Sequence, residues 1–142
     1  MKILIINGPN LNLLGTRETS IYGAAPWDEI FSQLQNQFSG RSVQLSHWQS
    51  NIEGEIIDKL QEADHWADGI ILNAGGYTHT SVAIGDAVKA ISTPVVEVHI
   101  SNITSRESFR HSSFISPHAV GVIFGFGVFG YSLAIEYFLL KK

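Results

Sequence analysis

The stretch that decides the fold is Asn7-Gly8-Pro9-Asn10-Leu11-Asn12-Leu13-Leu14-Gly15-Thr16-Arg17, which follows the apolar run 3–6. The apolar run predicts a buried strand, and the Gly, Pro and Asn residues after it predict a loop. Residues 8–25 separate this strand from the next predicted helix, whereas most connections of this kind are only a few residues long. In open α/β sheets, loops at the carboxyl ends of strands bind ligands. The stretch therefore predicts a ligand-binding loop, with an ordinary turn-rich connection as the simpler alternative.

Strand-like and helix-like patterns alternate along the rest of the chain. Apolar or alternating runs predict strands at 3–6, 42–48, 69–73, 94–99 and 120–124. Helical periodicity predicts helices at 26–39, 50–63 and 81–91, and a last helix that ends near 140. This alternation predicts one flavodoxin-like domain over residues 1–142, a three-layer α/β sandwich with a five-stranded parallel sheet of order 2-1-3-4-5.

Two capping-box patterns place helix starts. Ser50 with Glu53 would open the second helix, and Thr104 with Glu107 would open a short helix after the fourth strand. That short helix would carry two arginines one turn apart, Arg106 and Arg110.

Composition excludes several classes of function. The net charge of -4 gives no basic patch for nucleic acid, and the absence of cysteine fits a reducing cytoplasm. The first apolar run is too short for a signal peptide.

Residues 120–140 are apolar enough to suggest a membrane span, but their glycines predict a strand, a turn and a helix. The glycine pattern 125–130 resembles a dinucleotide fingerprint, yet only twelve residues follow it, so we interpret it as turn and packing glycines.

Polar side chains follow three strands that are neighbours in the predicted order. In that order the first and third strands flank the switch point, where ligands bind. The carboxyl ends of parallel strands meet at one edge of the sheet, so these side chains should converge: Asn10, Arg17, Tyr22, Asn73, His79, Glu97 and His99.

Three spaced motifs resemble those of the type II 3-dehydroquinate dehydratases. They are Gly8–Asn12 with Gly15–Arg17 and Tyr22-Gly23, then Asn73–Ser81, then Glu97–Asn102 with Arg106–Arg110. The resemblance implies reversible dehydration of 3-dehydroquinate to 3-dehydroshikimate through an enolate, without a Schiff base, cofactor or metal. It also implies a homododecamer built from trimers that serves the shikimate pathway, or alternatively quinate breakdown. The competing hypothesis is a non-catalytic module of the same fold that binds a small anion.

Tyr22 would unaided be a loop tyrosine with a half-buried ring. The resemblance makes it the general base. A phenol titrates near 10, so a tyrosinate at neutral pH needs a nearby cation, and Arg17 in the same loop is the candidate.

Glu97 and His99 are two residues apart in a predicted strand, so their side chains share one face. An ionisable pair on a buried strand is costly unless it is paired or used. The resemblance makes His99 the general acid and Glu97 the residue that orients it. A structural pair, or a metal site formed with His79, are the alternatives.

The remaining site residues are implied by the resemblance alone. Asn10 would stabilise the enolate oxygen through a water, and the substrate carboxylate would be held by Asn73, Ser101 and the Ile100 backbone. Ring hydroxyls would be held by His79, Arg110 and the Asp86 of a neighbouring subunit. The simpler alternatives are a helix-entry histidine, a solvated arginine and a surface pair of Asp86 with Lys89.

Overall fold

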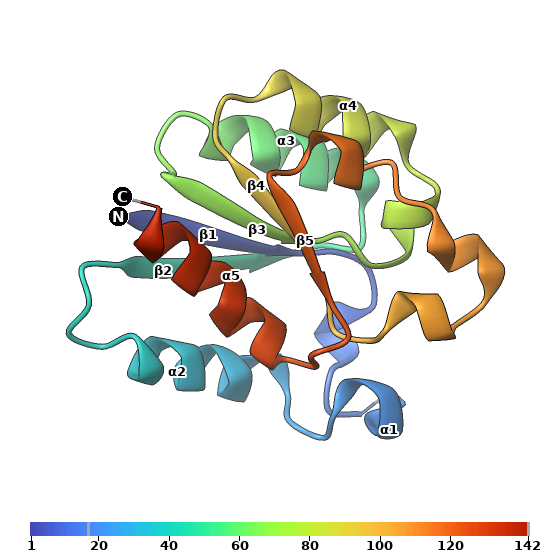
Figure 1. Cartoon of the computed structure of the whole chain (residues 1–142), viewed down its shortest axis with the longest axis horizontal. Coiled ribbons are helices and arrows are strands. Elements are labelled where there is room, and N and C mark those ends of the chain that lie inside the picture. The colour runs from blue at the N-terminus through green and yellow to red at the C-terminus, as the bar shows by residue number, and fades with distance from the viewer. Residues whose placement is uncertain (17, 142) are drawn as a thin grey trace.

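The computed structural model describes residues 1–16 and 18–141, apart from the side chain of Tyr22. One five-stranded parallel sheet forms the centre, with helices on both faces (Figure 1). Its spatial order is β2-β1-β3-β4-β5, so the predicted fold class and strand order are confirmed. The strands are β1 (Lys2–Asn7), β2 (Gln44–Gln49), β3 (Gly69–Asn73), β4 (Val95–His99) and β5 (Gly121–Phe124).

Helices α2 and α5 cover one face of the sheet, and α3 and α4 cover the other (Figure 1). A short helix, α1, lies in the long loop after β1 and was not predicted. The helices are α1 (Thr19–Tyr22), α2 (Trp27–Gln37), α3 (Glu53–Ala63), α4 (Val82–Ala90) and α5 (Phe129–Leu140).

The central strands are apolar on both sides because both faces of the sheet are covered. In β1, Ile3 and Ile5 pack in the cluster formed with α2 and α5. Leu4 and Ile6 point the other way, into the cluster formed with α3 and α4. Period-two alternation therefore divides one buried strand between two cores.

Both capping-box predictions are wrong. Glu53 is the first residue of α3 and Ile52 is its N-cap, so Glu53 stands too early to close the box with Ser50. Ser50 Oγ instead accepts a hydrogen bond from the Ile52 N–H at 3.0 Å and donates to the Glu55 carboxylate.

The second pattern does not open an α-helix. Residues 103–105 and 108–111 form two short 3-10 helices. Asn102, rather than Thr104, provides the cap, because its Oδ1 accepts from the Thr104 N–H at 3.1 Å. Arg106 therefore lies between the two turns, and it does not share a helix with Arg110.

The apolar segment near the end of the chain divides into β5 and α5, as predicted. Over residues 1–16 and 18–141, no helix is both long and apolar enough to cross a membrane.

The loops after β1 and β3 touch each other through their backbones. The Gly8 N–H donates to the Asn73 carbonyl at 2.7 Å. A Cβ atom on Gly8 would lie 2.6 Å from the carbonyl carbon of Ala74, so only glycine permits this approach. The contact holds the two loops together at the carboxyl edge of the sheet, where the predicted site residues lie.

Candidate active site

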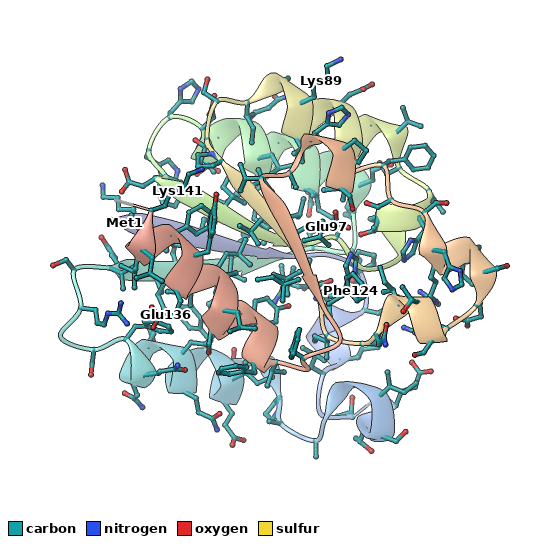
Figure 2. The ribbon with its side chains drawn as sticks, in the orientation of Figure 1. Met1, Lys89, Glu97, Phe124, Glu136 and Lys141 are labelled. Atoms are coloured by element: carbon teal, nitrogen blue, oxygen red, sulfur yellow. The ribbon has the colours of Figure 1, made fainter. Side chains whose placement is uncertain are left out.

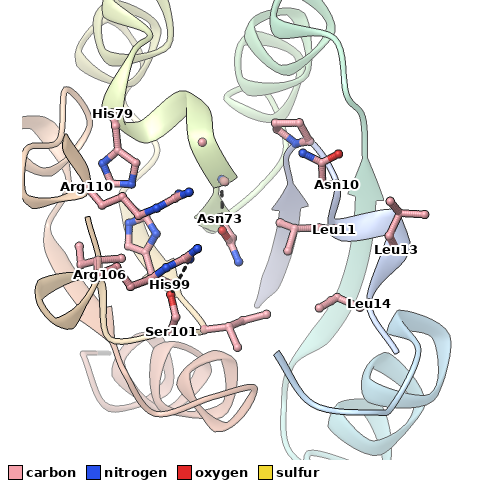
Figure 3. A pocket seen from close by; sticks show the side chains of 15 residues that line it. Asn10, Leu11, Leu13, Leu14, Asn73, His79, His99, Ser101, Arg106 and Arg110 are labelled. Atoms are coloured by element: carbon pink, nitrogen blue, oxygen red, sulfur yellow. Dashed lines mark hydrogen bonds between the residues drawn. The ribbon is translucent and has the colours of Figure 1, made fainter. Parts of the chain in front are cut away.

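A cavity of about 140 Å³ opens at the carboxyl ends of β1, β3 and β4. Histidine and arginine side chains line one side and the loop after β1 lines the other, with Asn73 between them (Figure 3). The cavity wall includes these predicted residues: Asn10, Asn73, His79, His99, Ile100, Ser101 and Arg110. The expected convergence is therefore present for Asn10, Asn73, His79 and His99, and Glu97 lies behind the cavity wall, bonded to His99.

Glu97 and His99 form a buried pair on the α3–α4 side of the sheet. Figure 2 shows Glu97 inside the molecule, and its exposed fraction is 0%, against 5% for His99. His99 Nε2 lies 2.7 Å from Glu97 Oε1. Because a carboxylate only accepts, Nε2 carries the proton. This leaves Nδ1 as the ring nitrogen that can act on a ligand.

Two serines also hold Glu97, and sequence analysis missed both. Ser116 Oγ donates to Oε2 at 2.6 Å, and Ser113 Oγ donates to Oε1 at 3.0 Å. Burial by itself raises the pKa of the Glu97 carboxyl, but the hydrogen bonds from His99, Ser116 and Ser113 outweigh burial and hold the pKa below its ordinary value. Glu97 is therefore an ionised carboxylate that orients the imidazole at neutral pH.

His79 lies beside His99 with the ring centroids 6.0 Å apart. Its Nδ1 donates to the Ser112 carbonyl at 2.7 Å, because a carbonyl can only accept. Burial lowers the pKa of His79, and the nearby charges of His99 and Arg110 lower it further, against the opposing effect of the Ser112 hydrogen bond. A neutral His79 therefore has Nε2 as an acceptor, which suits a ligand hydroxyl.

Two arginines bring positive charge to the cavity wall. Arg110 Nε donates to Glu107 Oε2 at 2.8 Å, and Arg106 Nη1 donates to Ser101 Oγ at 3.2 Å. Arg106 lines the cavity with Arg110, although the resemblance implies a substrate contact for Arg110 alone. The signal for Arg106 was its place in the third motif, four residues before Arg110.

Asn10 has φ of 68°, in the left-handed region that few residues other than glycine adopt. Asparagine is among the side chains that tolerate this conformation. The Asn10 N–H donates to Asn51 Oδ1 at 3.0 Å, which ties the loop after β1 to the segment before α3. This strained position turns the chain where it enters the cavity wall.

Comparison with known proteins identifies the family. Residues 1–139 match the family model described as dehydroquinase class II. The chain belongs to the class II dehydroquinase family. The 3-dehydroquinate dehydratase of Campylobacter jejuni is 56% identical over 135 residues, covering 95% of this chain and 85% of the relative. That of Fusobacterium nucleatum is 52% identical, covering 98% of this chain and 97% of the relative.

Solved dehydroquinase structures agree with the fold. The type II dehydroquinase of Butyrivibrio crossotus superposes with a TM-score of 0.94 at 46% identity, covering 97% of each chain. The resemblance predicted from the three motifs is therefore confirmed. With the family, the expectation of an enzyme of the carbon–oxygen lyase class is confirmed as well.

Two predicted site residues with described side chains, Glu97 and Asp86, do not line the cavity. Arg17 and the side chain of Tyr22 lie outside the described residues, so their roles stay predictions. Asp86 is exposed on α4 and is absent from the cavity wall. As expected from helix geometry, it points away from the core that contains Ile84 and Val88.

The metal-site alternative receives no support from the side-chain geometry. Within the described part of the chain, no three His, Asp or Glu side chains cluster closely enough to hold a metal ion. His79, Glu97 and His99 are instead linked by the Glu97–His99 hydrogen bond and the neighbouring imidazole rings.

Proposed function

We propose that this class II dehydroquinase catalyses the reversible dehydration of 3-dehydroquinate to 3-dehydroshikimate. The observation that carries the proposal is the buried Glu97–His99 pair, which places an oriented imidazole at a cavity with two arginines. The arginines suit an anionic ligand, and the neutral His79 suits a hydroxylated one. The curated relatives named above carry the name 3-dehydroquinate dehydratase.

The proposed chemistry begins with proton abstraction next to the ketone. Tyr22, as a phenolate beside the Arg17 cation, takes the C2 proton, and the electron pair moves into an enolate. Asn10 stabilises the enolate oxygen through a water. The enolate then returns its electron pair to form the carbon–carbon double bond as the C–O bond breaks. His99 supplies the proton with which the hydroxyl leaves as water.

The role of His99 is supported by its fixed orientation. Glu97 Oε1 accepts from the His99 Nε2–H, with 2.7 Å between Nε2 and Oε1. Nδ1 is therefore the atom from which an imidazolium would protonate the leaving oxygen. The Glu97 carboxylate, whose pKa is held low by its hydrogen bonds, is the acceptor that keeps this orientation. Glu97 is thus proposed to orient His99.

Substrate binding is proposed to divide between two sets of residues, one for the carboxylate and one for the hydroxyls. Asn73, Ser101 and the Ile100 N–H would hold the carboxylate. The hydroxyls would be held by His79, Arg110 and a neighbouring subunit's Asp86. The free Nε2 of His79 supports its part, because a neutral imidazole nitrogen accepts from a hydroxyl.

The test of activity is the appearance of enone absorbance when the protein is incubated with 3-dehydroquinate. Tyr22→Phe removes only the hydroxyl of the proposed base, and loss of a general base costs ~10²–10⁴ in rate. Tyr137→Phe is the matched control, because it deletes a hydroxyl on α5 that accepts from Lys141 away from the cavity. A Tyr22→Phe variant that keeps more than about a tenth of the wild-type rate excludes Tyr22 as the base.

We also propose that the active unit is at least a trimer, within a dodecamer, and that Asp86 completes a neighbour's site. The exposed position of Asp86 on α4 supports this. Subunits with Asp86→Ala are dissociated and reassembled with subunits carrying Tyr22→Phe. Recovered activity is expected, since some sites then combine an intact Tyr22 with an intact Asp86. Lys89→Ala on the same helix is the control and should stay active. If both single variants are impaired and the mixture regains nothing, the shared site is wrong.

The proposed biological role is the shikimate pathway, which leads to chorismate and the aromatic amino acids, in the cytoplasm. A deletion strain should then require aromatic amino acids. A strain that grows without them but fails on quinate would indicate the catabolic role instead. A protein that binds 3-dehydroquinate without forming the enone would instead be the small-anion module.

A further inference from the structure

Three buried polar side chains meet between the sheet and α5, in an otherwise apolar core. Asn7 ends β1 and Asn73 ends β3, and the two are direct partners in the strand register. Tyr131, in the first turn of α5, reaches both. Their exposed fractions are 1%, 3% and 0% respectively. Such groups are costly to bury unless they are hydrogen-bonded, and these three bond to one another, while Asn7 Nδ2 has no hydrogen-bond partner among the described residues.

The hydrogen bonds of Asn73 have only one consistent direction. The Gly75 N–H can only donate, so the atom 3.2 Å away is Asn73 Oδ1. Asn73 Nδ2 must therefore face Tyr131, and it donates to the Tyr131 hydroxyl at 2.8 Å. The single hydroxyl proton of Tyr131 then goes to Asn7 Oδ1, also at 2.8 Å. Burial raises the pKa of the Tyr131 phenol, so the proton stays and the direction does not reverse with pH.

The direction of these hydrogen bonds determines which atom of the Asn73 amide is available in the cavity that Asn73 lines (Figure 3). An amide nitrogen has two protons, and Tyr131 takes one, so the second is left for a ligand. A reversed amide would instead turn the Asn73 oxygen toward Tyr131 and the cavity, where it would repel a carboxylate. The reversed amide would also lose the bond from the Gly75 N–H.

We propose that Tyr131, supported by Asn7, is a positioning residue that fixes the Asn73 amide as a hydrogen-bond donor to a carboxylate. The inference deepens the proposed function, and it rests on the proposed contact between Asn73 and the substrate carboxylate. The carboxylate is present in both the ground state and the transition state, so the contact contributes equally to both. Losing it should raise KM while leaving kcat nearly unchanged.

The decisive variant is Tyr131→Phe, with Tyr137→Phe on the same helix as the matched control. A net hydrogen bond is worth roughly 1 kcal/mol, so KM should rise about three- to tenfold in Tyr131→Phe. The kcat of this variant should stay within about twofold of wild type, because no reacting group is touched. Tyr137→Phe should change neither constant. An unchanged KM in folded Tyr131→Phe would overturn the proposal.

A double-mutant cycle separates positioning from a general structural effect. If Tyr131 acts through Asn73, adding Tyr131→Phe to Asn73→Ala should leave KM within about twofold of Asn73→Ala alone. If the two effects multiply, Tyr131 acts independently of Asn73 and the positioning role is wrong.

A second measurement does not depend on turnover. In ¹⁵N spectra, the Asn73 side-chain amide is assigned by its disappearance in Asn73→Ala. It should show two well-separated, slowly exchanging protons in the wild type, and averaged or rapidly exchanging ones in Tyr131→Phe. A wild type without dehydratase activity would overturn the proposed function, whereas an Asn73 amide unaffected by Tyr131→Phe would overturn the positioning role.

Discussion

Gly8→Ala tests whether the contact between the two site loops is required. A Cβ on Gly8 would meet the carbonyl carbon and oxygen of Ala74 at 2.6 Å. Ordinary contact begins at 3.4 Å, so the loops must separate by about 0.8 Å. Both atoms of Ala74 belong to the backbone, and no side-chain rotation can relieve the overlap.

The expected loss of stability in Gly8→Ala has two parts. Overpacking of this kind costs about 1–3 kcal/mol. Separating the loops also weakens the 2.7 Å hydrogen bond from the Gly8 N–H to the Asn73 carbonyl, which adds roughly 1 kcal/mol. The free energy of unfolding should therefore fall by about 2–4 kcal/mol. Because Asn10 and Asn73 would move apart across the cavity, kcat/KM should fall by up to roughly 10²-fold.

The assay is urea unfolding at one fixed protein concentration, since the stability of the proposed oligomer would depend on concentration. Enone formation is measured on the same samples. The control is Gly54→Ala on α3, where a Cβ would meet nothing within 4 Å. Gly54→Ala should leave the free energy of unfolding unchanged or raise it by up to about 1 kcal/mol. A Gly8→Ala protein with the wild-type unfolding midpoint and rate would refute the argument.

Three further predictions follow from single contacts. Ser81→Ala should destabilise the fold by about 1 kcal/mol in chemical unfolding, because Ser81 Oγ caps α4 by accepting from the Ile84 N–H at 2.9 Å. Thr80→Ala is the control, and equal destabilisation by the two substitutions would contradict the cap. The Glu97 pKa lies below its ordinary value of 4.5, so the carboxylate stabilises the fold above that pH, and this stabilisation is lost as the pH falls through the lowered pKa. The stability difference between wild type and Glu97→Gln should therefore shrink as the pH falls below 4.5 and through the lowered pKa, and a difference constant with pH would show that Glu97 is not ionised. Borohydride with substrate should not inactivate the enzyme, because no lysine lines the cavity within residues 1–16 and 18–141; a substrate-derived mass on any lysine would contradict this.

Local patterns predicted most of the framework. Alternation along β4 correctly placed Glu97 and His99 on one face, and Val96 and Val98 on the other. Turn residues after the first strand marked the loop with Asn10. These predictions succeeded because strand periodicity and turn chemistry act between residues close together in the chain.

The capping boxes failed because other nearby side chains took their hydrogen-bond partners. Each pattern is compatible with a helix start, but neighbouring groups offered the same backbone atoms other partners. Ser50 bonds Glu55, and Asn102 takes the Thr104 N–H. Where local preferences are nearly equal, packing selects among them.

By itself, the sequence determined the alternation of strands and helices, the two buried faces of the sheet and the edge at which the site forms, because these follow from periodicity and from the fold class that it predicts. Only the tertiary structure decided which distant groups complete the site. Ser116 reaches Glu97 from 19 residues away, and Tyr131 reaches Asn7 from 124 residues away. Such pairings depend on where a turn or helix docks on the sheet, and no short-range pattern in the chain encodes that position. Buried polar groups are costly unless they are hydrogen-bonded, and these distant partners come together only when the core has packed.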